Sequence, residues 1–128
     1  MRINAAYRQA GVKPAESQIV GGITQGMSAA LFEEKIMDPD TGTMVNPNLH
    51  DYKIATAMDI PEIVPLFADV IDERLNNLGT KGLGEPARIP ASACIANAVY
   101  NALGVHVREI PMTPARVLAA LKRKEARP

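Results

Sequence analysis

The stretch that decides the fold runs QIVGGITQGMSAALFEE over residues 18–34. Ile19, Ile23 and Met27 recur every four residues within it, which places their side chains on one face of an α-helix. Ser17 stands directly before this stretch, and serine favours the N-cap position of a helix. The pattern therefore predicts an amphipathic helix over 18–34 that begins after Ser17.

Three glycines interrupt this predicted helix at Gly21, Gly22 and Gly26. Each glycine in a helix interior costs up to about 1 kcal/mol relative to alanine. Two explanations account for that cost. A neighbouring helix packs closely against the glycines, or a ligand approaches the backbone there.

The remaining pattern predicts an α+β domain with three helices and a few short, mostly antiparallel strands. Residues 91–103 are apolar on nearly every side, which is typical of a buried helix and makes Cys94 a buried small hydrophobe. Gly104 suits the end of that helix, and Thr113 with Pro114 suits the start of a third one. Asp38 to Gly42 is a turn signal. Strands are predicted at 34–37 paired with 43–46, at 49–58, at 63–70 and at 105–107.

Composition excludes several classes of function. The 128 residues suit one domain, and the 14 basic and 14 acidic side chains give no net field toward nucleic acid or a membrane surface. No apolar stretch approaches the roughly 20 residues of a membrane span, so we expect a cytoplasmic protein. One cysteine excludes an intrachain disulfide. No metal-ligand spacing, phosphate-binding loop or nucleophile motif is present, so no protein side chain is predicted to ligate a metal.

The loop GTKGLGEP, residues 79–86, carries the most promising chemistry. Its glycines allow backbone N–H groups to converge on an anion, and Glu85 follows them directly. A carboxylate shielded from water is a stronger base, which suits a general base. The alternative is a surface glycine loop with a solvated glutamate.

Four ordered blocks resemble the large, molybdopterin-binding subunit of the xanthine dehydrogenase and aldehyde oxidase family of molybdenum hydroxylases. The loop at 82–86 resembles that family's KGxGE(P) motif, and 18–26 resembles its Q-x-x-G-G/A-x-x-x-G helix. Residues 49–61 are similar to its DY-x-[IL]-P-T … D-[IL]-P stretch, and the tail from 91 to 118 agrees as well. The resemblance covers roughly residues 17–121, in the order of the family's C-terminal segment.

The resemblance implies a reaction and a set of site residues. It implies hydroxylation of an aldehyde or N-heterocycle carbon with water-derived oxygen, with Glu85 as the general base. It implies a molybdenum–pyranopterin cofactor, with iron–sulfur clusters and FAD on other domains or subunits. The cofactor-binding residues that it implies are Gln18, Gly21, Gly22, Gln25, Gly82, Leu83 and Gly84.

The family's subunit is several times longer than this chain, so the resemblance implies a segment of such an enzyme. We expect residues 17–128 to form the single α+β cofactor-binding domain, and 1–16 to be atypical because the family's G-R-x-x-N-P turn is missing there. The isolated chain is expected to be inactive, to bind no cofactor and to self-associate. A second hypothesis is a truncated non-catalytic fragment, or an interaction module that completes a partner large-subunit chain.

Overall fold

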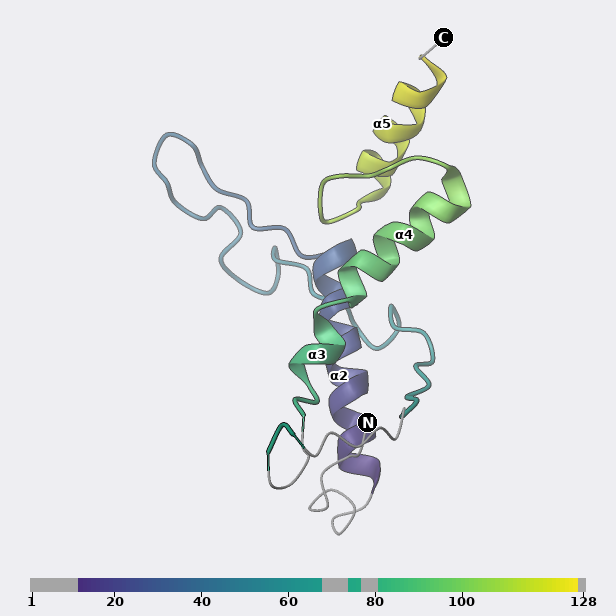
Figure 1. Cartoon of the computed structure of the whole chain (residues 1–128). Coiled ribbons are helices and arrows are strands. Elements are labelled where there is room, and N and C mark those ends of the chain that lie inside the picture. The colour runs from purple at the N-terminus through teal and green to yellow at the C-terminus, as the bar shows by residue number, and fades with distance from the viewer. Residues whose placement is uncertain (1–11, 68–73, 77–80, 127–128) are drawn as a thin grey trace.

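The computed structural model describes residues 12–67, 74–76 and 81–126. Its longest element is α2, Val12–Leu31, shown in purple to blue in Figure 1. The helix was expected at 18–34, but it begins earlier and ends earlier than that. Pro14 does not break α2 because it lies in the first turn, where backbone N–H groups have no helical partner. Ser17 consequently lies inside the helix and is not its N-cap.

Three further helices follow. α3, Glu85–Arg88, is a single turn inside the predicted loop, and α4 spans Ala91–Leu103. Gly104 ends α4 in the left-handed conformation, with φ of 64°, as predicted for that position. α5, Pro114–Glu125, begins as predicted, because Thr113 is its N-cap and the threonine hydroxyl oxygen accepts a hydrogen bond from the Arg116 N–H.

The expected strands are wrong for the described residues. Within the predicted hairpin at 34–46, a single antiparallel bridge forms, between Met37 and Met44. Residues 49–58, 63–67 and 105–107 are irregular, and 68–70 of the predicted second strand lie outside the described residues. A strand exists only through hydrogen bonds to a neighbouring strand, and a period-two pattern does not specify whether that neighbour lies in the same chain. The described fold is therefore helical.

Residues 32–60 form an excursion from the end of α2 and back to it (Figure 1). Its base is closed by Asn46, which is 4% exposed. The Asn46 side chain donates to the Glu34 carbonyl over 2.7 Å and accepts from the Ile36 N–H over 2.9 Å. At its tip, the predicted turn forms between Asp38 and Gly42, and hydrogen bonds led by the Thr41 hydroxyl lower the pKa of Asp38.

The return of this excursion is fixed to Glu33 at its start and to Ser28 of α2. Tyr52 donates its hydroxyl proton to Glu33 over 3.0 Å, and that hydrogen bond raises the pKa of Tyr52. The Ala55 N–H donates to the hydroxyl of Ser28, a buried residue of α2, over 2.9 Å. The excursion is therefore held by polar contacts rather than by a sheet.

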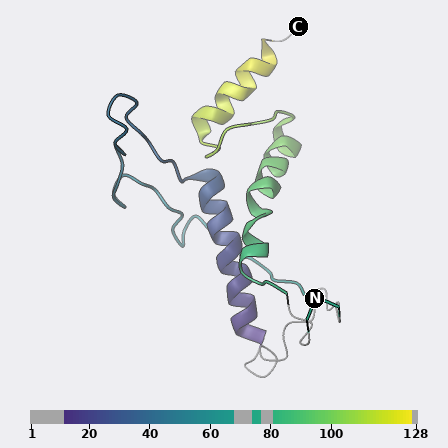
Figure 2. The ribbon, with the colours of Figure 1, turned by 60° about the vertical axis from the view of Figure 1, so that its left-hand side comes forward.

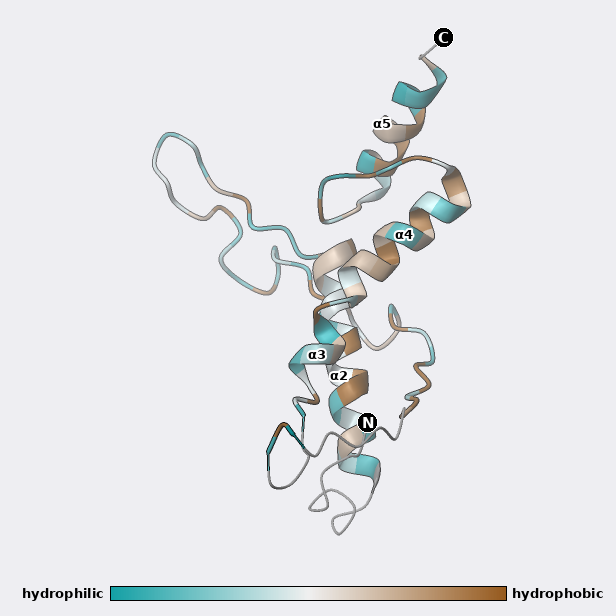
Figure 3. Cartoon of the chain, in the orientation of Figure 1, coloured by the Kyte–Doolittle hydropathy of each residue, from teal (hydrophilic) through white to brown (hydrophobic). Residues whose placement is uncertain are grey.

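α2 packs against α3 and the first turn of α4, and α4 diverges from α2 beyond that turn (Figures 1 and 2). The buried apolar side chains are few and mostly small: Ala15, Ala30, Ala91, Val105, Met112 and Ala120. Large apolar side chains such as Met58 and Leu66 are 94% and 86% exposed. Figure 3 colours several residues of α2 and α4 brown, as hydrophobic.

The total accessible surface area of the chain reflects this limited burial. The accessible surface is 9487 Å² for a 13.7 kDa chain, whereas a compact monomer of that mass exposes about 6,600 Å². Only Ala91 of α4 is buried, so the expectation of a buried helix is wrong for this chain by itself, and Cys94 is exposed. Beyond Ala91, the residues of α4 are half-buried or exposed.

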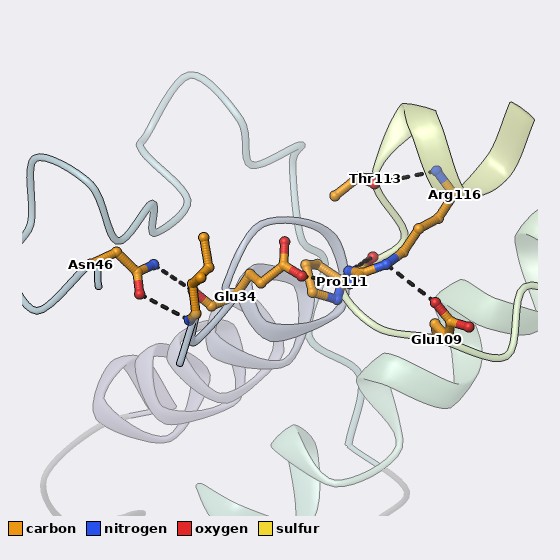
Figure 4. A network of polar contacts seen from close by, with 7 residues as sticks. Glu34, Asn46, Glu109, Pro111, Thr113 and Arg116 are labelled. Atoms are coloured by element: carbon orange, nitrogen blue, oxygen red, sulfur yellow. Dashed lines mark hydrogen bonds and ion pairs between the residues drawn. The ribbon is translucent and has the colours of Figure 1, made fainter. Parts of the chain in front are cut away.

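Arg116 of α5, drawn in Figure 4, makes several polar contacts with the rest of the described chain. Arg116 donates to the Pro111 carbonyl over 2.9 Å and forms an ion pair with Glu34, three residues after the end of α2. A longer ion pair, 3.5 Å, links Arg116 to Glu109. Met112 adds a backbone hydrogen bond to Ala30 over 2.7 Å. These contacts set the position of α5 beside the C-terminal end of α2.

Within the described ranges, no helix combines the length and the apolar character that crossing a membrane requires.

Candidate cofactor-binding site

The glycines of α2 let the predicted loop approach the helix. A Cβ atom built on Gly22 would lie 2.6 Å from the Gly84 carbonyl oxygen and 3.2 Å from the Ala87 Cβ. One built on Gly26 would overlap Ala91, the first residue of α4. Both glycines are buried, so close packing against α3 and α4 accounts for their cost in helix propensity.

Gly21 is different. A Cβ atom built there would meet nothing within 4 Å, so packing inside this chain does not require a glycine at that position. Gln18 lies three residues before Gly21 and Gln25 four residues after it, which places all three on one face of α2. Gly21 therefore leaves open space between two glutamine side chains.

This face of α2 and the start of α3 enclose a cavity of about 310 Å³, called here the polar cavity. Its lining residues are Ser17, Gln18, Gly21, Gly22, Gln25, Gly84, Glu85 and Arg88. Six of the eight predicted site residues are in that set. The structure thus brings together the helix block and the loop block, which are about 60 positions apart in sequence.

Gln18 is the residue that joins the two blocks most closely. A Cβ atom built on Gly84 would lie 3.1 Å from Oε1 of Gln18, so the glutamine amide lies over the loop backbone. Glycine at 84 keeps that approach open. The side chains of Gln18 and Gln25 are both exposed toward solvent, with donors and acceptors available to a ligand.

Glu85 is the first residue of α3, and Pro86 follows it in the first turn. The Glu85 backbone carbonyl accepts a hydrogen bond from Ile89 over 3.1 Å, which fixes the turn from which its carboxylate projects. In this chain Glu85 is exposed, as in the alternative of a surface glycine loop. The residues described here provide no cover over it.

The other two predicted residues face another cavity. Gly82 and Leu83 line an apolar cavity of about 470 Å³, together with the stripe of Ile19, Ile23 and Met27 on α2. The apolar stripe that predicted the helix therefore borders an open apolar hollow rather than a closed core. The loop separates this hollow from the polar cavity, with 82–83 on one side and 84–85 on the other.

Two residues of the polar cavity were not predicted. Ser17 had been assigned to a helix cap, and Arg88 lies three residues after Glu85, on the same turn of α3. That spacing is a signal in the sequence, because residues three apart in a helix share a face. Arg88 adds an exposed guanidinium to a cavity otherwise lined by amides, glycines, one serine and Glu85.

The residues of the polar cavity fit a polar, anionic cofactor. The glutamine amides and the Arg88 guanidinium supply hydrogen-bond donors, and Gly21 supplies clearance. Among the described residues, no group of three or more histidine, cysteine, aspartate or glutamate side chains is arranged to hold a metal ion. Glu85 is thus a lone carboxylate, which suits a proton acceptor beside a ligand.

Comparison with known proteins identifies the family to which the chain is related. A family model described as a molybdopterin cofactor-binding domain matches residues 12–61. The xanthine dehydrogenase molybdenum-binding subunit of Escherichia coli O157:H7 is 46% identical over 80% of this chain. The aldehyde oxidoreductase molybdenum-binding subunit PaoC of Escherichia coli K12 is 40% identical over 94% of it. The chain spans only 14% and 16% of the length of these two relatives.

Solved structures give the same result. Quinoline 2-oxidoreductase from Pseudomonas putida 86 superposes with a TM-score of 0.74 at 37% identity, over 84% of this chain and 14% of that one. Carbon monoxide dehydrogenase from Oligotropha carboxidovorans shares the fold, with a TM-score of 0.73 over 85% of this chain and 14% of that one. By sequence and by fold, the chain belongs to the xanthine dehydrogenase and aldehyde oxidase family of molybdenum hydroxylases, as a segment related to the molybdenum-binding subunit.

Proposed function

We propose that this chain forms one wall of the active site of a molybdenum hydroxylase, with Glu85 as the general base. The observation that carries the proposal is the polar cavity, where six of the eight residues chosen from sequence meet at one place. The match to a molybdopterin cofactor-binding domain, which includes the whole of α2, supports the same role.

Within this site, each residue has a distinct task. Gln18 and Gln25 hold the pyranopterin by hydrogen bonds, and Gly21 leaves room for it beside α2. Gly84 carries the chain past the Gln18 amide and presents Glu85 at the cavity wall. Arg88 places a positive charge beside an anionic cofactor. Gly82 and Leu83 border the adjacent apolar cavity.

When bound, the molybdenum–pyranopterin cofactor supplies the redox centre that accepts two electrons from the substrate carbon. Glu85 accepts a proton at its carboxylate as water-derived oxygen is transferred to an aldehyde or N-heterocycle carbon. General-base catalysis by a positioned carboxylate contributes about 10²–10⁴-fold to a rate. Iron–sulfur clusters and FAD on other domains or subunits carry the electrons onward in this proposal.

A second candidate function follows from the exposed apolar surface. Large apolar side chains such as Met58 and Leu66 are almost fully exposed, and the apolar cavity is open to solvent beside the exposed Cys94. Such a surface suits an interaction module that completes a partner chain without itself taking part in catalysis. Both candidates require the remainder of a molybdenum-binding subunit, but only the first requires Glu85.

Co-expression tests the proposal. The 128-residue chain would be produced with the remaining part of a related molybdenum-binding subunit, and the purified complex would be analysed for molybdenum. We expect the two chains to copurify with stoichiometric metal, and the 128-residue chain purified alone to contain none, because one helix and one loop cannot enclose a large cofactor. Copurification without molybdenum would support the interaction module instead.

A further inference from the structure

A third cavity lies at the far end of α4 from the polar cavity. It is a cavity of about 520 Å³, called here the basic cavity, between the 104–109 connection and α5. Its lining residues are Gly104, Val105, His106, Val107, Arg108, Glu109, Arg116, Ala120, Arg123 and Lys124. α4 has 13 residues and spans about 20 Å, so this cavity is well separated from Glu85.

The charge of this cavity is strongly unbalanced. Four cationic side chains line it against one carboxylate, Glu109. Arg116 is neutralised, since it pairs with both Glu109 and Glu34. In the part of the chain that the structure describes, the other three cations, Arg108, Arg123 and Lys124, have no carboxylate partner.

Two of the cavity's basic groups are held in position by backbone contacts. The Lys124 ammonium donates to the Leu103 carbonyl over 3.3 Å, and it would lie 2.9 Å from a Cβ built on Gly104. The glycine therefore leaves room for the lysine beside the end of α4. Arg123 donates through Nε to the Ala119 carbonyl over 3.2 Å, so its terminal nitrogens remain available.

Buried apolar residues and a stacked pair of rings define the shape of the basic cavity. Val105 and Ala120 are buried, at 7% and 8% exposure, and form an apolar floor. His106 at the rim stacks on Tyr100 of α4, with ring centroids 4.1 Å apart and an angle of 12° between the rings. A volume of about 520 Å³ falls in the range of small-molecule pockets, roughly 300–1,000 Å³, rather than that of an extended peptide groove.

From these observations we propose that the basic cavity binds a small organic anion carrying two or three negative charges, through Arg108, Arg123 and Lys124. Arginine guanidinium groups bind both phosphate and carboxylate oxygens by paired hydrogen bonds, so the recognised chemistry is the oxyanion. The site is independent of the role proposed for Glu85. The helix dipole alone favours basic residues at any exposed position of the last turn of α5. Anion binding also explains why basic residues of α5 lie over a cavity.

The test uses the full chain and two probes, inorganic pyrophosphate and citrate, titrated separately at constant ionic strength. Binding would be followed by calorimetry and by the amide resonances of Val105 and Ala120. We expect saturable one-to-one binding of at least one probe, and at least tenfold weaker binding by the Arg108→Ala/Arg123→Ala double variant. Binding of pyrophosphate alone would assign a phosphate ligand, and binding of citrate alone a carboxylate ligand.

Lys122→Ala is the matched control, because Lys122 lies on the same turn of α5 but does not line the cavity. It should bind the probe within about twofold of the unmodified chain. The proposal would be overturned if neither probe bound saturably, or if Lys122→Ala weakened binding as much as the double variant did. The second result would show attraction to the general charge of the helix end.

Discussion

The Gly84 carbonyl oxygen lies only 2.6 Å from the position that a Cβ atom on Gly22 would occupy. Because the contact is with backbone, a side chain at Gly22 cannot be accommodated by rotating a neighbour. The helix and the loop that carry the candidate site are therefore in contact through a glycine, and their separation sets the width of the polar cavity.

Replacement of this glycine should separate the two blocks. Gly22→Ala is expected to destabilise the chain by about 1–3 kcal/mol, because overpacking of a close contact forces backbone to move. Gly21→Ala is the matched control on the same helix, since its Cβ would meet nothing within 4 Å. It should stabilise the helix by up to about 1 kcal/mol. Urea unfolding of both variants checks the pair, and equal effects would contradict the assigned packing.

The sequence was informative where its signals were local. The apolar stripe of Ile19, Ile23 and Met27 predicted a helix that forms, and Thr113 and Gly104 marked helix ends that occur where expected. Such features depend on neighbours three or four residues away, so one chain contains all the information needed.

Predictions that depended on distant partners were less successful. The strand patterns at 49–58 and 105–107 have the alternation of sheets but no neighbouring strand among the described residues. The burial expected for Cys94 also needs cover that the described part of this chain does not supply. The site residues were chosen by their motifs, and Arg88 was missed because no motif residue marks it.

The exposed apolar surface predicts association. Large side chains such as Met58 and Leu66 are almost fully exposed, and the apolar cavity beside α2 is open. We expect the isolated chain to self-associate and to bind a hydrophobic dye, because burying apolar surface contributes about 25 cal/mol per Å². Light scattering with dye fluorescence measures both properties. A strictly monomeric chain that binds no dye would count against this expectation.

Acid should loosen the return of the 32–60 excursion. The backbone N–H of Thr56, followed by its hydroxyl, donates to Asp59 and lowers the pKa of that carboxyl below 3.8. A lowered folded-state pKa means that the stabilisation is fully present above the unfolded value and is lost as pH falls through the folded value. The carboxyl carbon resonance of Asp59 should therefore titrate with a midpoint below 3.8. A midpoint at or above that value would contradict the hydrogen bonds.

The central claim is that Glu85 is the base of the hydroxylation, and Glu85→Gln in the complete molybdenum-loaded enzyme tests it most directly. Glutamine keeps the shape of the side chain but cannot accept the proton. Glu62→Gln, an exposed carboxylate that lines neither described cavity of the site, is the control. Both variants should retain wild-type molybdenum content, which separates chemistry from cofactor binding.

The measurement is the rate of enzyme reduction by substrate under single-turnover conditions, together with the metal content of each variant. The account predicts a loss of at least about 10²-fold, toward 10⁴-fold, for Glu85→Gln and a near wild-type rate for Glu62→Gln. If Glu85→Gln reacted at more than about a tenth of the wild-type rate with full metal loading, a general-base effect of that size would be absent, and Glu85 would not be the base.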